Sequence, residues 1–249
     1  MQAQPHAGGC HDRLPSMTKI NAPPQPSQPA SFTRFDTSEL SPREVYKLLI
    51  GTVVPRPIAW VTTLSPDGIV NAAPYSFFNC LSADPPILAL GVENWHDMSF
   101  KDTAYNIRMT EEFTVNIVTD ALVEAMNVTA TPFSSDINEL DEARLTTAPG
   151  SLIQCPRIAE APVAFECRRH VGISVGKSRE IILGLVVAIH IRSDLIDRDR
   201  LHVDQMALDA VGRMGGHGYA LTRQLFDLPT MSVADWDAGH IPKRSVTSS

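Results

Sequence analysis

Residues 58–73 read IAWVTTLSPDGIVNAA, and this stretch indicates the fold class of the protein. Its first seven residues are rich in β-branched side chains, which favour a strand. Residues 65–68 then combine serine, proline, aspartate and glycine, with the proline at the second position of a tight turn. An apolar arm follows over residues 69–73, so the stretch predicts a β-hairpin.

Strand signals continue towards the C-terminus. A strand is predicted over residues 87–92, directly after two adjacent prolines that cannot lie in the middle of a sheet. Another is predicted over residues 113–118, and the runs 163–175 and 180–191 flank a GKSR turn that is typical of a second hairpin. Six or more strands without regular βαβ alternation predict a mostly β fold with peripheral helices. We expect an antiparallel barrel rather than a doubly wound parallel sheet.

Three helices are predicted outside the sheet. Ser41 is a favourable N-cap, with proline in the first turn, for a helix that ends near residue 49. Ser99 and Asp102 match the S-x-x-D capping pattern of a helix over residues 100–109, so Asp102 is assigned to capping. Another helix is expected over residues 121–129. The polar excursion over residues 131–151 that follows would form a lid or rim.

Composition bounds the classes of function. The chain has 249 residues and a formal net charge of -7, so it lacks the positive field that would attract nucleic acid or anionic lipid. No apolar run approaches the roughly 20 residues of a membrane span. Four cysteines without a C-x-x-C pair favour reduced thiols in a soluble, cytoplasmic protein. The eight histidines show no metal-binding spacing, so no metal site is expected.

Three segments are expected along the chain. Residues 1–31 predict a disordered leader rather than a signal peptide, because glutamines and prolines interrupt any apolar region, and Met17 is a candidate start. Residues 32–231 would form one barrel domain. The polar residues 232–249 are expected to be a tail that could pack on a partner subunit.

Two short motifs are interpreted as structural. Residues 172–176 match the G-x-S-x-G elbow of serine hydrolases, but the β-branched neighbours of Ser174 favour a continuous strand. The glycines of residues 212–218 have no strand before them, as a dinucleotide fingerprint requires, and are expected to form a flexible turn. His170 and His190 lie in β-rich runs and are expected to be satisfied, half-buried side chains.

Several motifs occur together in a fixed order. They are PRPIAWVTT at residues 55–63, DGIVNAAPYSFFN at 67–79, LSADPPIL at 81–88, KDTAYNI at 101–107 and EFTVN at 112–116. This order and spacing resemble the flavin reductase-like family of FMN-binding split barrels, over about residues 41–228. The resemblance implies an antiparallel split β-barrel, an FMN cofactor and a homodimer with FMN near the interface.

FMN combines a dianionic phosphate, a polar ribityl chain and a flat ring. Lys101 and Thr103 lie at the start of a predicted helix, where free N–H groups and the helix dipole favour a phosphate. Arg56 is a second phosphate candidate, and a solvated loop arginine is an equally weighted interpretation. In residues 74–79, backbone N–H groups freed from ladder pairing would reach the ring edge.

The resemblance extends these assignments to side chains. Tyr75 and Ser76 would line the ring with Phe77 and Phe78, of which one is core because strand neighbours face opposite sides. The segment around Arg213 and Tyr219 resembles one that lies near the flavin or the dimer seam in relatives. The cofactor-binding residues expected are Arg56, Pro74, Tyr75, Ser76, Phe77, Phe78, Asn79, Ser82, Lys101, Thr103, Arg213 and Tyr219, with Asn79 and Ser82 on ribityl hydroxyls or phosphate.

The resemblance implies an NAD(P)H-dependent flavin reductase, in which NADH or NADPH passes hydride to bound FMN and electrons go on to free flavin or another acceptor. Catalytic side chains are not expected, because the flavin carries the chemistry. Many relatives have an Asp-His pair where Arg179 and Glu180 stand here, a position linked to nicotinamide use. An FMN electron carrier without a nicotinamide site therefore stays an alternative, as does a binder of another planar ligand such as haem.

Overall fold

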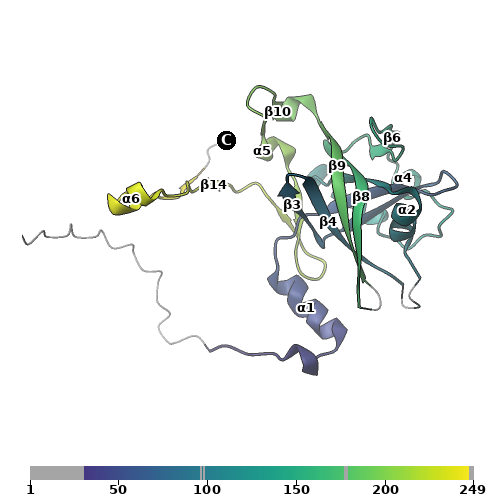
Figure 1. Ribbon diagram of the computed structural model, residues 1–249, viewed down its shortest axis with the longest axis horizontal. Coiled ribbons are helices and arrows are strands. Elements are labelled where there is room, and N and C mark those ends of the chain that lie inside the picture. Colours follow the sequence, from purple (N-terminus) through teal and green to yellow (C-terminus); the bar gives the residue numbers. More distant parts are fainter. Residues whose placement is uncertain (1–30, 96, 98, 177–178, 247–249) are drawn as a thin grey trace, which may run out of the picture. The chain divides into compact units, whose positions relative to one another are not determined.

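The computed structural model describes residues 31–95, 97, 99–176 and 179–246 (Figure 1). Within it, residues 36–224 form one compact unit, and the two chain ends, up to Phe35 and from Leu225, form a smaller one. The predicted leader and the candidate start Met17 lie outside the described residues, except for residue 31.

The larger unit is built on one antiparallel sheet of seven strands, in the order β2-β1-β5-β8-β9-β4-β3. Strands β2 and β3 lie at opposite ends of this order, yet only residues 76 and 77 separate them in the chain. The sheet must therefore curl until its two edges come close, which makes a split barrel and confirms the predicted mostly β fold. The strands are β1 (Ala59–Leu64), β2 (Val70–Tyr75), β3 (Phe78–Ala83), β4 (Pro86–Glu93), β5 (Glu112–Ile117), β8 (Val163–Val175) and β9 (Arg179–Ile191).

Both predicted hairpins are present. Strands β1 and β2 pair across the turn at residues 65–68, and β8 and β9 pair from Val163↔Ile191 to Val175↔Arg179. Residues 177 and 178 of the second turn lie outside the described residues. Ser174 continues β8, which confirms the strand interpretation of the G-x-S-x-G motif.

Strand β1 is buried on both faces. Val61 packs in one apolar cluster with Leu90 and Phe113, whereas its neighbour Trp60 packs in a second cluster with Met126. Adjacent strand residues point to opposite faces, so β1 lies between the first cluster, which includes residues of α2, and the second, which includes residues of α3 and α4. The indole N–H of Trp60 is satisfied by the Thr129 hydroxyl at 2.9 Å.

The remaining elements are short, and no helix in the described part of the chain is long and apolar enough to cross a membrane. The helices are η1 (Thr37–Glu39), α1 (Pro42–Thr52), α2 (Asp102–Thr110), η2 (Asp120–Leu122), α3 (Val123–Val128), α4 (Glu139–Glu142), η3 (Ser193–Leu195), α5 (Gln205–Leu208) and α6 (Val233–Asp237). Small strand pairs are β6 (Thr147–Ala148) with β7 (Arg157–Ile158), β10 (Ile196–Asp197) with β11 (His202–Val203), β12 (Val211–Arg213) with β13 (Tyr219–Leu221), and β14 (Phe226–Asp227) with β15 (Ser245–Val246). The expected polar tail thus contains α6 and β15.

The start of α1 confirms the sequence prediction, and the start of α2 corrects it. Ser41 and Glu44 form a reciprocal capping box on α1. The predicted box between Ser99 and Asp102 is wrong, because the backbone N–H and hydroxyl of Ser99 both donate to Asp97, at 2.9 and 2.6 Å. Helix α2 begins only at Asp102, and no side chain caps it. The N-cap residue Lys101 therefore provides no side-chain acceptor for the first N–H groups of α2.

The excursion over residues 131–151 is anchored to the sheet at its end by Glu166. The Glu166 side chain is 0% exposed and accepts hydrogen bonds from the backbone N–H groups of Ser151 and Leu152, at 2.6 and 2.7 Å. The Ser151 hydroxyl donates to it at 2.9 Å, and His190 Nε2 lies 2.5 Å away. Burial alone would raise the pKa of Glu166, but these hydrogen bonds together lower it to about 2.

We expect Glu166→Gln to lower the free energy of unfolding by about 1 to 2 kcal/mol at neutral pH, because the amide accepts fewer and weaker hydrogen bonds. The folded-state pKa lies below the ordinary value of 4.5, so this contribution is present above that value and is lost as pH falls towards 2. Urea unfolding at several pH values would measure both effects. Glu142→Gln, at an exposed position, is the control. Parallel pH profiles for wild type and Glu166→Gln would contradict the prediction.

Candidate functional site

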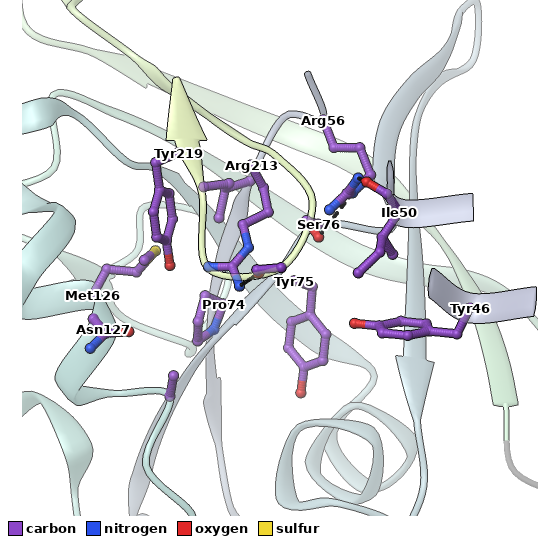
Figure 2. Close-up of a pocket in the computed structure, with 13 residues that line it drawn as sticks. Tyr46, Ile50, Arg56, Pro74, Tyr75, Ser76, Met126, Asn127, Arg213 and Tyr219 are labelled. Carbon is purple, nitrogen blue, oxygen red and sulfur yellow. Dashed lines mark hydrogen bonds between the residues drawn. The ribbon is translucent and has the colours of Figure 1, made fainter. Parts of the chain in front are cut away.

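Two cavities of the larger unit share a wall made by Pro74 and Tyr75 at the end of β2. The first, here named the tyrosine cavity, has a volume of about 240 Å³ and is lined by Tyr46, Tyr75 and Tyr219 among others (Figure 2). The second, the helix cavity, has a volume of about 150 Å³ and is lined by the first residues of α2 and by the chain after α3. Because both cavities include Pro74 and Tyr75, they lie next to each other.

Arg213 and Tyr219 come from the β12–β13 hairpin, where they are directly paired. The Arg213 guanidinium lies over the Tyr219 ring, 4.5 Å from its centre, and Nη2 donates to the Gly216 carbonyl at 2.7 Å. Figure 2 shows this guanidinium directed into the cavity beside Pro74. The flexible turn expected over residues 212–218 is thus a hairpin, with Gly216 at a φ of 59° where a side chain would be strained.

Arg56 is 6% exposed and uses its guanidinium within the protein. Nη1 donates to the carbonyls of Ile50 and Val53 at the end of α1, each at 2.8 Å. Nη2 donates to the Met214 carbonyl at 3.0 Å, and Nε to the Ser76 hydroxyl at 3.3 Å. Neither a solvated loop arginine nor an open phosphate ligand matches this arrangement, which favours a clamp joining α1 to the hairpin. A phosphate contact of Arg56 stays a prediction.

The helix cavity combines the uncapped start of α2 with one cation. Lys101 is the N-cap residue, and its Nζ lies 5.1 Å from the centre of the Trp95 ring. Thr103 is buried, with its hydroxyl 3.0 Å from the Asn71 side-chain amide. Free N–H groups and the positive end of the α2 dipole favour an anion here.

Two carboxyl groups also line the helix cavity. Burial raises the pKa of Asp102 and that of Glu139, and Glu139 accepts a hydrogen bond from the Ala72 N–H at 2.9 Å. Burial likewise raises the pKa of Tyr75 to about 12, so its phenol stays protonated and can donate a hydrogen bond at neutral pH. An anion in this cavity would therefore depend on Lys101 and the α2 N–H groups to offset Asp102.

The backbone between β2 and β3 is paired over more of residues 74–79 than the sequence analysis expects. Strand β2 continues through Pro74 and Tyr75, with Pro74 opposite Trp60, so only Ser76 and Phe77 leave the ladders. Proline is tolerated there because β2 is an edge strand, whose outer side has no strand partner.

Phe77 and Phe78 separate as predicted. The Phe77 side chain is 41% exposed and its ring centre lies 6.2 Å from that of Tyr46, whereas Phe78 packs against the barrel core. On β3, Asn79 Oδ1 accepts from the Cys80 N–H at 2.8 Å, and Ser82 Oγ accepts from the Asp84 N–H at 3.2 Å.

The predicted cofactor-binding residues are therefore divided between the two cavities, and some of them line neither. The tyrosine cavity brings together Arg56, Pro74, Tyr75, Ser76, Arg213 and Tyr219, and the helix cavity adds Lys101 and Thr103. Phe77, Phe78, Asn79 and Ser82 line neither cavity. Flavin contact stays a prediction for all twelve.

Some lining residues escaped the sequence analysis. Tyr46 and Ile50 reach the tyrosine cavity from α1, and Met126 and Asn127 reach it from α3. The four-residue spacing of Tyr46 and Ile50 indicates a shared helix face, but not what that face meets. Glu139 of the polar excursion was also missed, and its burial depends on a backbone partner that is distant in sequence.

Arg179 and Glu180, which stand where the family resemblance leads us to expect an Asp-His pair, are engaged within the protein. Glu180 is 1% exposed, and its Oε2 accepts a hydrogen bond from Nε of Arg108 at 3.0 Å. Nη2 of the same guanidinium lies 3.0 Å from this oxygen as an ion pair. Arg179 pairs with Glu93 at 2.5 Å. The Glu180 carboxylate is thus closed off against α2 and is not offered to a second substrate.

Comparison with known proteins yields one family and several close structural neighbours. The family described as flavin reductase like domain matches residues 50–207. A protein of Deinococcus radiodurans is 43% identical over 212 residues, which cover 83% of this chain and 93% of that protein. Nitrilotriacetate monooxygenase component B from Bacillus cereus superposes with a TM-score of 0.77 at 30% identity, over 80% of this chain and 100% of its own. For 2-nitrobenzoate 2-nitroreductase from Pseudomonas fluorescens, the TM-score is 0.74 at 36% identity, over 81% of this chain and 98% of that protein.

Proposed function

This chain belongs to the flavin reductase-like domain family, and from that membership we propose that it is an FMN-binding, NAD(P)H-dependent flavin oxidoreductase. The observation that supports FMN most directly is the Pro74–Tyr75 wall shared by the two cavities. FMN is a long molecule with an anionic phosphate at one end and a flat aromatic ring at the other. A polar cavity with a cation, adjoining an aromatic cavity, suits both ends.

The residues present fit that cofactor. The uncapped N–H groups at the start of α2, with Lys101, would hold the phosphate. Pro74, Tyr75 and Ser76 would lie along the ring, to which the protonated Tyr75 phenol can donate a hydrogen bond. When bound, FMN supplies the redox chemistry by accepting hydride and passing electrons on. The protein then orients the ring and leaves one face of it accessible.

The test is to mix the purified protein with FMN and then with NADH or NADPH under anaerobic conditions. We expect the flavin absorbance at about 450 nm to bleach with at least one of the two nucleotides, because hydride transfer reduces the ring. Heat-denatured protein with the same additions is the control. FMN that binds but is bleached only by dithionite or by a partner reductase would reject the nicotinamide-dependent activity.

The arrangement around Glu180 favours one alternative, an FMN electron carrier without a nicotinamide site. The Asp-His pair of relatives is replaced, and Arg108 holds the carboxylate of Glu180. The two similar structures suggest two classes of electron acceptor. One belongs to a monooxygenase component and the other to a nitroreductase of a nitroaromatic acid.

A homodimer is part of the proposal. Helix α1 has no buried residue, Tyr46 and Leu49 are exposed on it, and so is Val53 directly after it. A helix of 11 residues is marginal in water unless an apolar face is covered. A second copy of the chain would provide that cover, next to the tyrosine cavity. Sedimentation of the purified protein would test it.

A further inference from the structure

The face of the sheet that carries the first apolar cluster continues to one end of the strands. On β5, Ile117 is two residues beyond Val115 of that cluster, and on β8, Val163 is two residues before Phe165, which packs against it. Alternate residues of a strand share a face, so these side chains point to the same side as the cluster. Both β8 residues are paired with isoleucines of β9. An apolar surface therefore extends past the cluster, where β5 and β9 end and β8 begins.

A cavity of about 440 Å³, here named the strand-end cavity, is lined by this surface and by residues of β11, α5 and β12. Among the described residues that line it, none is charged and only Gln205 has a polar side chain. Val163 and Val211 are each 5% exposed, whereas Ile189 is 57% exposed. The cavity therefore extends from an open side at Ile189 to side chains that are nearly buried.

The walls and size of the strand-end cavity indicate the chemistry of its ligand. A bound water molecule needs two to four polar partners, which these side chains do not supply, so an apolar molecule gains by replacing water there. A charged ligand would lose its hydration without meeting a side chain of opposite charge. The volume lies within the roughly 300 to 1,000 Å³ of small-molecule sites and exceeds that of the tyrosine cavity.

We propose that the strand-end cavity binds small uncharged compounds built on one or two apolar rings, with at most one polar group for Gln205. Because the cavity reaches nearly buried side chains, a small molecule fills it better than the broad surface of another chain. Among the described residues, Ile58 is the one that it shares with the tyrosine cavity, and it shares none with the helix cavity. The site is thus separate from the residues assigned to FMN, and the inference does not rest on the proposed function.

The experiment compares indole with indole-3-carboxylate, which adds one negative charge to the same ring system. Titration calorimetry is run on the purified protein before and after it is loaded with FMN. We expect indole to bind about tenfold more tightly than the carboxylate or better, because no cationic side chain lines the cavity. FMN should leave the Kd for indole unchanged, since the two ligands occupy different cavities.

Two variants place the binding in this cavity. Ile189→Trp adds a larger ring at its open side and should weaken indole binding about tenfold or more, because the space is then filled by the protein itself. Ile173, on the same hairpin, is 45% exposed and lines none of the three cavities. Ile173→Trp is therefore the matched control and should bind indole like the wild type. Both substitutions are at exposed positions, where the fold tolerates a change of size.

The outcomes that overturn the inference differ from those that overturn the proposed function. Equal binding of indole and indole-3-carboxylate to the wild type, or no binding of either, would refute the apolar site without recourse to any variant. Displacement of indole by FMN would place it in the tyrosine cavity and also refute the inference. If the wild type bound no indole and Ile189→Trp shifted a dimer to monomers in sedimentation, a second copy would be the occupant instead. Protein that binds indole as expected but no FMN would refute the proposed function and support the inference.

Discussion

Replacing Arg56 by methionine is expected to lower the free energy of unfolding by about 3 kcal/mol or more, with partial loss of the tyrosine cavity. Methionine fills similar space but donates nothing to the carbonyls of Ile50, Val53 and Met214. Each of these acceptors would lose a charge-assisted hydrogen bond, and the last turn of α1 would lose the cation at its negative end. Urea unfolding followed by circular dichroism measures the loss.

The variant Arg56→Lys distinguishes two roles of Arg56, the clamp that joins α1 to the hairpin and the phosphate contact predicted from the sequence. Lysine keeps the charge but cannot reach four acceptors in a planar arrangement, so we expect it to be nearly as destabilising as methionine. Arg200→Gln serves as the exposed control, with little effect on stability. If Arg56→Met unfolded like the wild type and yet bound FMN much more weakly, Arg56 would be a phosphate ligand and not a clamp.

The sheet was predictable because its signals are local. The turn at residues 65–68 brings together strands that are adjacent in sequence, and the long runs of β8 and β9 pair in the same way. The closure of the barrel was not contained in any single segment. It follows from the order of all seven strands, in which the consecutive strands β2 and β3 become the two edges. The family resemblance, and not the local pattern, anticipated the split barrel.

The errors lie where one polar group had two possible partners. Ser99 could have capped α2 but donates to Asp97, which is only two residues away. Arg56 donates to a carbonyl 158 residues along the chain, an acceptor that sequence spacing does not predict, and its phosphate contact stays a prediction. The glycine-rich segment after Arg213 was interpreted as a flexible turn, since its short strands, β12 and β13, have three residues each and show little periodicity.

Lys101→Ala is the second change with a large expected effect, a rise of about 10- to 100-fold in the Kd for FMN. Ser99 does not cap α2, because its N–H and hydroxyl donate to Asp97. The N-cap residue of α2 makes no side-chain capping bond, and among the described residues Lys101 is the only lysine or arginine that lines the helix cavity. Asp102 and Glu139 also line this cavity, so loss of the lysine leaves their charge without a neighbouring side-chain cation to offset it. Flavin fluorescence quenching on titration measures the Kd.

Charge, rather than packing, should account for the Lys101 effect. Lys101→Glu is therefore expected to weaken FMN more than Lys101→Ala does, and both deficits should shrink at high salt, where the screening length falls to about 3 Å. Riboflavin, which has the ring but no phosphate, should bind the wild type and Lys101→Ala alike. Lys47 is exposed on α1 and lines neither cavity. Lys47→Glu makes the same charge reversal there, so the Kd of this variant for FMN should match that of the wild type. Equal losses of riboflavin and FMN affinity in Lys101→Ala would place Lys101 at the ring and move the phosphate out of the helix cavity.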